Sequence, residues 1–312
     1  MHFTLRQLEV FEAVARLGSY TKAARELHLS QPAVSMQVAQ LEEQAGIALL
    51  EQVGRQARLT EAGRELYARV RAVQRELAEA EEVLAAHRGL RGGRLRLAVA
   101  TTAGAFATRV LAAFARRHPG VRLALEIINR AELLARLEAH EADLAIMGQP
   151  PAGAPLRARP FLDNPLVVIA SPEHPLAGQR RIPLARLAEE RFVLREEGSG
   201  TRGALERLFA GHGLVLRAEL EMSTNEAIKQ SVAAGLGLAV VSLHTLELEL
   251  AAGRVRILDV EGFPLMRRWY LVQRRGRRLG PAAAAFAAFL PEVAAEMVRL
   301  PDGVAPTGRE AV

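Results

Sequence analysis

Apolar residues recur at helical spacing in the first part of the chain, in blocks separated by turn-forming residues. The pattern predicts one helix over residues 5–17, which Gly18 ends, and a second, short helix over residues 21–28. A third helix is predicted from the N-cap Ser30 to about residue 44, because a serine hydroxyl accepts a hydrogen bond from an unpaired backbone N–H. The spacing fits a helix-turn-helix or a small structural bundle, and by itself it does not separate the two.

The third predicted helix has two unlike faces. Val34, Val38 and Leu41 form an apolar stripe, and the opposite face is small or polar. Residues 47–60 then predict a two-stranded wing with Gly54 at its tip. A helix with short side chains at its start suits the major groove, and its first N–H groups can bind phosphate. The candidate DNA-binding residues are Thr21, Lys22, Ser30, Gln31, Pro32, Ser35, Met36 and Arg55.

A heptad pattern follows from residue 60. Apolar or small residues recur in alternating steps of three and four from Gly63 to Leu84, which predicts a long helix with a coiled-coil seam. The candidate dimerisation residues are Leu66, Val70, Val73, Leu77 and Leu84. The alternative is that this helix packs on its own C-terminal domain. Residues 90–93, with two glycines, predict a hinge.

Residues 91–300 alternate between short apolar runs and helical patterns, which predicts parallel α/β units. Strands are expected at residues 95–100, 121–128, 142–147, 166–170, 192–195, 217–221, 238–241, 255–259 and 268–273. Helices are expected at residues 103–117, 131–140, 201–211, 225–234, 243–251 and 281–299. The tail at 301–312 is expected to be flexible.

Three hydroxyl-rich turns, at residues 101–102, 199–202 and 223–225, each precede a predicted helix. Helix starts carry unpaired N–H groups and the positive end of the helix dipole, so they suit an anion, although each hydroxyl could simply be an N-cap. If the turns face one cleft, a ligand site is the better interpretation. The candidate effector-binding residues are Thr101, Thr102, Gln149, Ser199, Gly200, Thr201, Arg202, Thr224, Asn225 and Lys229.

Composition narrows the class of protein. The net charge is +6, yet basic and acidic residues balance over residues 1–60 and again over 61–93, so charge does not locate a DNA site. The chain has no cysteine, which excludes disulfides. It has no apolar run of membrane-spanning length, and its first residues do not resemble a signal peptide. We therefore expect a cytoplasmic protein with no membrane partner.

Signals for an enzyme are weak. The eight histidines are scattered, and no nucleophile elbow or P-loop occurs, so no catalytic residue, metal site or cofactor is expected. His118, His174 and His244 are interpreted as surface or capping residues. Arginines 267, 268, 274, 275, 277 and 278 form either a second nucleic-acid patch or, as we favour, a solvated face at a strand end.

The N-terminal residues resemble those of the LysR-type transcriptional regulators. The resemblance is carried by Ser19–Ala24, Leu29–Ser35, Leu41-Glu42 and Leu59–Gly63. The chain departs from the family pattern at Met36, Ala48, Leu50 and Gln52, so DNA contacts that family arginines make at such positions are not assumed here.

The resemblance implies a whole architecture. Residues 1–60 would be an all-α winged helix-turn-helix, 61–90 a linker helix for dimerisation, and 91–300 an α/β effector domain like the two-lobed, type 2 periplasmic binding proteins. Lobe I would hold residues 91–162 and 267–300, and lobe II residues 163–266, joined by two crossing strands. The partners implied are a double-stranded DNA operator, a second copy in a homodimer or homotetramer, RNA polymerase and a small anionic effector.

Within the family the chain is most similar to the CbbR-type regulators of Calvin-cycle genes, through residues 35–38, 51–55, 143–148 and 222–246. Such regulators respond to phosphorylated sugars or organic acids, which agrees with an anion-suited cleft. A regulator of another pathway, such as sulfur or nitrogen assimilation, shares much of this pattern. A transport solute-binding protein would share the two lobes, but it would need a signal peptide and no helix-turn-helix.

Overall fold

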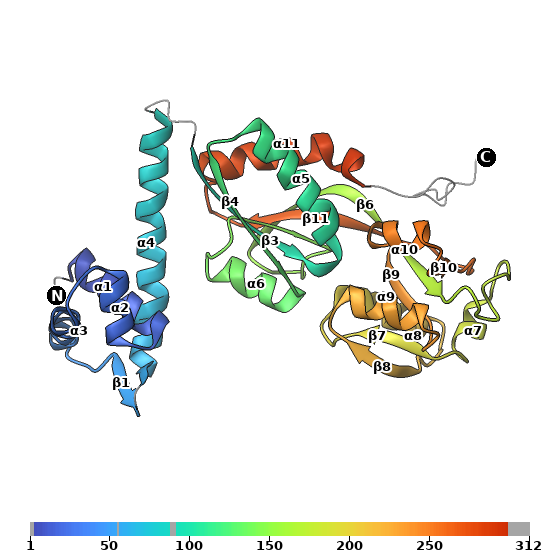
Figure 1. Ribbon diagram of the computed structural model, residues 1–312, viewed down its shortest axis with the longest axis horizontal. Coiled ribbons are helices and arrows are strands. Elements are labelled where there is room, and N and C mark those ends of the chain that lie inside the picture. The colour runs from blue at the N-terminus through green and yellow to red at the C-terminus, as the bar shows by residue number, and fades with distance from the viewer. Residues whose placement is uncertain (1–2, 55, 88–91, 299–312) are drawn as a thin grey trace. The chain divides into compact units, whose positions relative to one another are not determined.

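The computed structural model describes residues 3–54, 56–87 and 92–298, and these fall in two compact units, residues 1–84 and 85–312 (Figure 1). The N-terminal unit contains three helices, a hairpin and a long helix. They are α1 (Leu5–Leu17), α2 (Tyr20–Glu26), α3 (Gln31–Ala45), β1 (Leu50–Val53), β2 (Gln56–Leu59) and α4 (Glu61–His87). The predicted winged helix-turn-helix is confirmed, including the antiparallel wing with Gly54 in its turn.

Local capping sets the helix boundaries in this unit. Ser19 Oγ accepts a hydrogen bond from the backbone N–H of Lys22, and Ser30 Oγ accepts one from Ala33, each at 3.3 Å. Gly18 and Gly46 end α1 and α3 in the left-handed conformation, which glycine adopts without steric cost. The stops and starts predicted from these residues are therefore confirmed.

Helix α4 approaches the wing so closely that residue 63 must be glycine. A Cβ at Gly63 would lie 1.9 Å from the carbonyl oxygen of Leu49, closer than any real contact. Further along α4, Val70 is only 2 % exposed, within the apolar core that α1 and α3 form, and Leu66 packs against the same core. This corrects part of the predicted coiled-coil seam, because Val70 fills its own protomer's core. Val73, Leu77 and Leu84 remain exposed on α4.

The C-terminal unit begins with three parallel strands. Strand β3 (Gly93–Ala100) lies between β4 (Val121–Ile128) and β5 (Leu144–Met147), with α5 (Gly104–Arg117) and α6 (Arg130–Glu138) as the connections. Helix α11 (Pro281–Met297) lies beside α5 on one face of the sheet, and α6 covers the other (Figure 1). We call this part lobe I.

Two long strands extend the sheet out of lobe I, as the resemblance implied. Strand β6 (Leu156–Ala170) runs antiparallel to β11 (Leu265–Arg274), and β11 also pairs with β5. The short strand predicted at residues 166–170 is therefore only the end of β6. Residues 156–163 are exposed or partly buried and form no continuous apolar run, so the sequence pattern did not reveal them as strand. The predicted parallel α/β units are present in β3, β4 and β5, and the two long strands add antiparallel pairs, so the whole sheet is mixed.

The remaining elements form lobe II. They are α7 (Leu184–Leu187), β7 (Phe192–Arg195), α8 (Gly200–Gly211), β8 (Ala218–Met222), α9 (Asn225–Ala233), β9 (Ala239–Ser242), η2 (Leu243–Thr245), α10 (Glu247–Ala251) and β10 (Arg256–Ile257). The single helix predicted over residues 243–251 is wrong, since a 3₁₀ turn and a short α-helix take its place. The proposed lobe boundaries stay a prediction.

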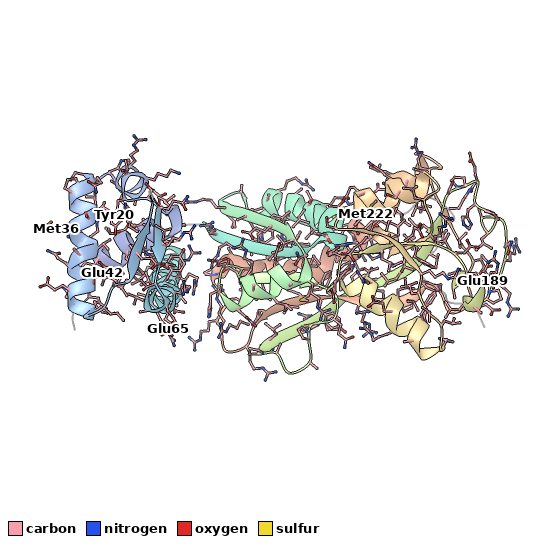
Figure 2. All side chains as sticks on the ribbon, turned by 90° about the horizontal axis from the view of Figure 1, so that it is seen from below. Tyr20, Met36, Glu42, Glu65, Glu189 and Met222 are labelled. Atoms are coloured by element: carbon pink, nitrogen blue, oxygen red, sulfur yellow. The ribbon has the colours of Figure 1, made fainter. Side chains whose placement is uncertain are left out.

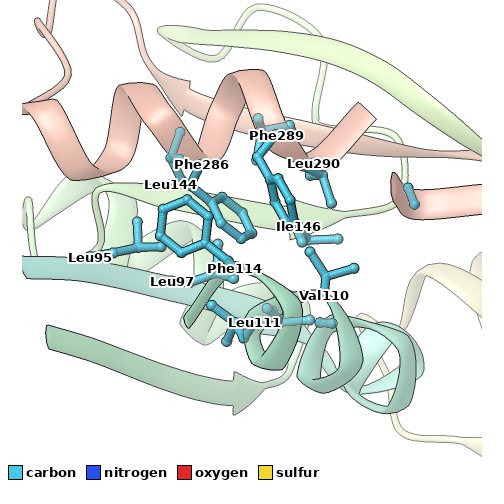
Figure 3. Close-up of a cluster of buried hydrophobic side chains, with 14 of the residues drawn as sticks. Leu95, Leu97, Val110, Leu111, Phe114, Leu144, Ile146, Phe286, Phe289 and Leu290 are labelled. Carbon is cyan, nitrogen blue, oxygen red and sulfur yellow. The ribbon is translucent and has the colours of Figure 1, made fainter. Parts of the chain in front are cut away.

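Side chains that alternate between the two faces of β3 explain the layers of lobe I. Leu95, Leu97 and Val99 point to the face that α5 and α11 cover, and Ala98 points to α6. Figure 3 shows Phe114 of α5 near Phe286 and Phe289 of α11 in this core, with ring centroids 5.3 and 5.5 Å apart. A rigid lobe I is the result, and it fixes the positions of the strand ends that line the site below.

Among the described residues, no helix is long and apolar enough to span a membrane. The same residues contain no cluster of three or more side chains suited to hold a metal ion. The hinge predicted at residues 90–93 falls outside the described residues except for Gly92 and Gly93, and the predicted tail at 301–312 lies wholly outside them.

Candidate DNA interface and effector cleft

The outer face of α3 presents the side chains predicted to read DNA. Gln31, Pro32, Ser35 and Met36 are all exposed, and Met36, labelled in Figure 2, is 54 % exposed. Val34 and Val38, on the opposite face of α3, are buried against the rest of the N-terminal unit. The core therefore holds α3 by one stripe and leaves the other face open for the major groove.

Other predicted DNA contacts surround this face. Thr21 and Lys22 are exposed in the first turn of α2, and Ser30 stands at the start of α3, where its hydroxyl caps the helix. Arg55, the last of the predicted contacts, lies outside the described residues.

Glu42 fixes the wing relative to α3. Its Oε1 accepts hydrogen bonds from the backbone N–H groups of Leu49 and Leu50 at 2.8 and 3.0 Å. Glu12 plays a similar part between α1 and α4, since its Oε1 accepts from Arg16 and from Arg71, each at 3.1 Å. These bonds therefore fix the wing to α3 and fix α4 to α1.

The C-terminal unit has a cleft between its two lobes that is partly open to solvent. Lobe I contributes the carboxyl ends of β3 and β5 and the start of α6, and lobe II contributes the end of β7 and the start of α8. Strands β6 and β11 form its floor. Clefts at the carboxyl ends of parallel strands are where α/β proteins usually bind ligands.

Half of the predicted effector-binding residues line this cleft. They are Thr101, Thr102, Ser199, Gly200 and Thr201. Ser199 occupies the N-cap position of α8, yet its side chain makes no capping hydrogen bond, so its hydroxyl is available to a ligand. Thr224, by contrast, caps α9 by accepting from the N–H of Ala227 at 3.2 Å. The capping interpretation thus holds for Thr224 and not for Ser199.

The other predicted effector-binding residues, Gln149, Arg202, Thr224, Asn225 and Lys229, do not line the cleft. Lys229 is buried, and its Nζ contacts Glu249 Oε1 at 2.8 Å and the carbonyl oxygen of Thr245 at 3.0 Å. Arg202 bonds Glu206 and Glu221 at 2.7 and 2.6 Å. Because carboxylates already hold these two cations, the prediction that they supply charge to the effector is wrong in this structure.

Sequence reasoning missed the central residue of the cleft. Arg195, at the end of β7, is 4 % exposed. Its Nη1 donates to Asn225 Oδ1 at 2.9 Å, its Nη2 to Thr101 Oγ1 at 3.1 Å, and Glu196 accepts from both Nε and Nη2 at 2.7 Å. The sequence signal that could have identified Arg195 is its position directly after the apolar run 192–194, at the end of a predicted strand. Asn225 therefore acts behind the cleft, as a support for Arg195.

Two further arginines line the cleft. Arg130 opens α6 and Arg267 lies on β11. Burial, together with the charge of nearby Arg207, lowers the pKa of both guanidinium groups from the usual value. Their placement corrects the interpretation of the arginine run at 267–278: Arg267 faces the cleft, and Arg277 bonds Asp143 Oδ1 at 2.9 Å.

Of the three singled-out histidines, His244 was interpreted wrongly. It is buried between the lobes, and its Nδ1 accepts a hydrogen bond from Trp269 Nε1 at 3.3 Å. Burial and the charge of Arg109 lower the pKa of His244 from 6.5 to about 4, so the ring is neutral. His118 takes the C-cap position of α5, and the Nδ1 of His174 accepts from the N–H of Leu176, in line with capping roles.

Similar proteins have the same two-part organisation. Residues 5–64 match the model of the bacterial regulatory helix-turn-helix protein, lysR family, and residues 88–295 match the LysR substrate binding domain. The RuBisCO operon transcriptional regulator of Allochromatium vinosum is 58 % identical over 297 residues, which cover 95 % of this chain and 98 % of the relative. The transcriptional activator CmpR of Synechocystis is 45 % identical over 287 residues, or 92 % and 94 % of the two chains.

Solved structures agree with these matches. The regulatory domain of CcmR from Synechocystis, solved in complex with 2-PG, has a TM-score of 0.63 and 45 % identity, and covers 65 % of this chain and 97 % of that one. A full-length OxyR variant from Pseudomonas aeruginosa covers 100 % of both chains with a TM-score of 0.71 at 24 % identity, a likeness of fold alone. With its helix-turn-helix and its effector domain both matched, the chain belongs to the LysR family of bacterial transcriptional regulators.

Proposed function

We propose that this regulator controls carbon-fixation genes from the cytoplasm, as a dimer or tetramer, and that a small anionic metabolite held between the two lobes sets its activity. The observation that carries the proposal is the cleft itself. Hydroxyls from two helix starts, at Thr101, Thr102, Ser199 and Thr201, meet there beside arginines. Helix starts with unpaired N–H groups stabilise anions, and hydroxyls donate to their oxygens.

The chemical class of the effector follows from the donors. Phosphate and carboxylate groups accept several hydrogen bonds at once, which the hydroxyls and backbone N–H groups around the starts of α5 and α8 can donate. A relative's regulatory domain was solved with 2-PG, and the effector of this chain is proposed to be a phosphorylated sugar or organic acid of the same kind. A neutral, apolar ligand would leave the buried polar groups of the cleft without partners.

Control requires that the effector distinguish two arrangements of the lobes. Its free energy of binding must differ between them, because a ligand of equal affinity for both shifts nothing. The bond from Arg195 in lobe II to Thr101 in lobe I places donors from both lobes at one point. An anion that contacts both sides would therefore favour the closed arrangement, with a coupling to DNA binding of about 1–3 kcal/mol.

DNA reading is assigned to α3. Exposed Gln31, Ser35 and Met36 would meet base edges, and the N–H groups at the helix start would meet phosphate. Two copies joined through exposed Val73, Leu77 and Leu84 of α4 would present two such helices to a near-palindromic operator. Regulation of transcription from that operator would involve contact with RNA polymerase.

The proposal that the regulated genes are carbon-fixation genes rests on the chain's relatives. The 58 % identical protein from Allochromatium vinosum is a RuBisCO operon transcriptional regulator. Footprinting of the purified full-length protein across its own genome tests this assignment. Protection upstream of carbon-fixation genes, altered several-fold by phosphorylated metabolites, is the expected result. Protection only at operators of unrelated pathways, such as sulfur or nitrogen assimilation, would refute it.

A further inference from the structure

We propose that the effector cleft has a second anionic subsite, formed by Arg130, Arg207 and Arg267, so that the effector of this protein carries two negatively charged groups. This inference rests on the proposed function, since it assumes that the first anionic group lies at the helix starts. The three arginines come from different parts of the fold, namely α6 of lobe I, α8 of lobe II and the crossing strand β11. Arg130 and Arg267 line the cleft, and Arg207 lies next to them, just outside the lining.

The charge of the cleft is the first argument. Its charged lining residues are Arg130, Arg195, Arg267 and Glu196, which leaves a net charge of +2. Glu196 is already committed to Arg195 through two contacts of 2.7 Å. No carboxylate among the described residues forms an ion pair or hydrogen bond that the structure records with Arg130, Arg207 or Arg267. The positive charge is therefore left for a ligand.

The closeness of the three arginines is the second argument. The charge of Arg207 lowers the pKa of both Arg130 and Arg267, and Arg130 has the same effect on Arg267. No acidic group opposes this, and only Tyr270 raises the pKa of Arg267. Like charges that the fold holds close together repel one another, and a bound anion relieves the repulsion.

The face of α8 provides room for these side chains. Gly200, Gly203 and Arg207 share one side of the helix, at spacings of three and four. A Cβ at Gly200 would lie 3.6 Å from Arg130 Nη1, and one at Gly203 would lie 3.3 Å from Arg207 Nη1. Gly200 thus lets the guanidinium of Arg130 from lobe I approach the backbone of lobe II, and Gly203 leaves room for Arg207 on the same helix. An anion held there would touch both lobes.

The test compares ligands that differ in one charged group. Glycerol 3-phosphate and 3-phosphoglycerate differ at one terminal carbon, and fructose 6-phosphate and fructose 1,6-bisphosphate form a second pair with a longer spacing. Trp269 is the only tryptophan of the chain and lines the cleft, so its fluorescence reports binding to the full-length protein. In at least one pair the doubly charged ligand should bind about tenfold tighter or more, the usual value of charge-assisted hydrogen bonds.

The arginine variants locate the second group. In Arg207→Gln and Arg267→Gln that preference should fall to about threefold or less, while the affinity for the singly charged partner changes little. Arg191→Gln is the matched control, because it removes one positive charge from an exposed position of lobe II where Arg191 contacts Glu219 at 3.8 Å. It should keep the wild-type preference. Because Arg207 is exposed on α8, its variant is expected to fold even if Arg267→Gln does not.

The outcomes separate the two proposals. If singly charged ligands bind as tightly as doubly charged ones in both pairs, or if the preference survives Arg207→Gln and Arg267→Gln, the second subsite does not exist, although the anion cleft does. If no anion of either kind binds the wild type at millimolar concentration, the cleft is not an anion site and the proposed function fails with it.

Discussion

A hydrogen bond of 3.1 Å joins Nη2 of Arg195 to Oγ1 of Thr101, and it connects the two lobes of the effector domain. Arg195 ends a strand of lobe II and Thr101 follows a strand of lobe I. The same guanidinium donates to Asn225 at 2.9 Å, which fixes its orientation from behind. A ligand that enters the cleft therefore meets donors that are already aligned across the lobe boundary.

Thr102 tests the helix-start site with a nearly isosteric change. Unlike the hydroxyl of Thr101, that of Thr102 has no protein partner among the described hydrogen bonds, so it can donate to a ligand. Thr102→Val should weaken binding of a phosphorylated ligand by roughly 1.5–3 kcal/mol, the value of a hydrogen bond to a charged group. Calorimetric titration measures the loss, and Thr102→Ser, which keeps the hydroxyl, is the control. Equal affinity of wild type and Thr102→Val would remove Thr102 from the site.

The reading face of α3 can be tested residue by residue. Gln31→Ala and Ser35→Ala should each weaken specific operator binding by roughly 1–3 kcal/mol, because each is expected to lose a base contact. Gln44→Ala is the control, since Gln44 is exposed in the last turn of α3, about 20 Å along the helix from Gln31. Operator titrations at fixed salt provide the measurement. The assignment fails if Gln44→Ala is as damaging as the other two variants.

Dimerisation and folding should separate along α4. Val73 and Leu77 are 41 % and 42 % exposed, so Asp at both positions should abolish dimers at micromolar concentration while the N-terminal unit stays folded. Val70→Ala should instead destabilise that unit by roughly 1–3 kcal/mol, because Val70 fills its core. Sedimentation and thermal unfolding give the two readouts. Dimers that persist in the double variant would exclude this stretch of α4 as the interface.

His244 should make the effector domain less stable in mild acid. Its pKa in the folded state is about 4, below the ordinary 6.5, so as the pH falls between these values the unfolded state gains a proton before the native state does. Stability is therefore full above pH 6.5 and is lost toward pH 4, by about 3 kcal/mol at most. His244→Gln can still accept from Trp269 and should flatten this dependence in denaturant unfolding.

The exposed His212 offers the matched comparison for that measurement. His212→Gln should leave the pH dependence of unfolding as in the wild type, because His212 lies on the surface at the C-cap of α8. If both variants behave alike, the acid sensitivity of the domain has another origin.

Features that depend on neighbours along the chain could be predicted from the sequence. Ser30 caps α3 and Gly46 ends it through contacts within one turn, so their types and positions specify these boundaries. The apolar stripe of α3 and the run that became β4 follow the helical and strand periods directly. For the same reason the sequence predicted the exposed reading face, and the motif residues indicated the family.

The polar groups that meet in the cleft, by contrast, are brought together by contacts between distant parts of the chain. Ser199 and Thr224 occupy the same N-cap position in the sequence pattern, yet only Thr224 caps its helix. Lys229 was predicted to bind an anion, but in the folded chain it pairs with Glu249. Arg267 was predicted to be solvated, but on β11 it lines the cleft. Val70 likewise fits the spacing of the coiled-coil seam, but it is buried in the core of its own protomer. Such partners lie far apart in the chain, and periodicity along the sequence carries no information about contacts between distant segments.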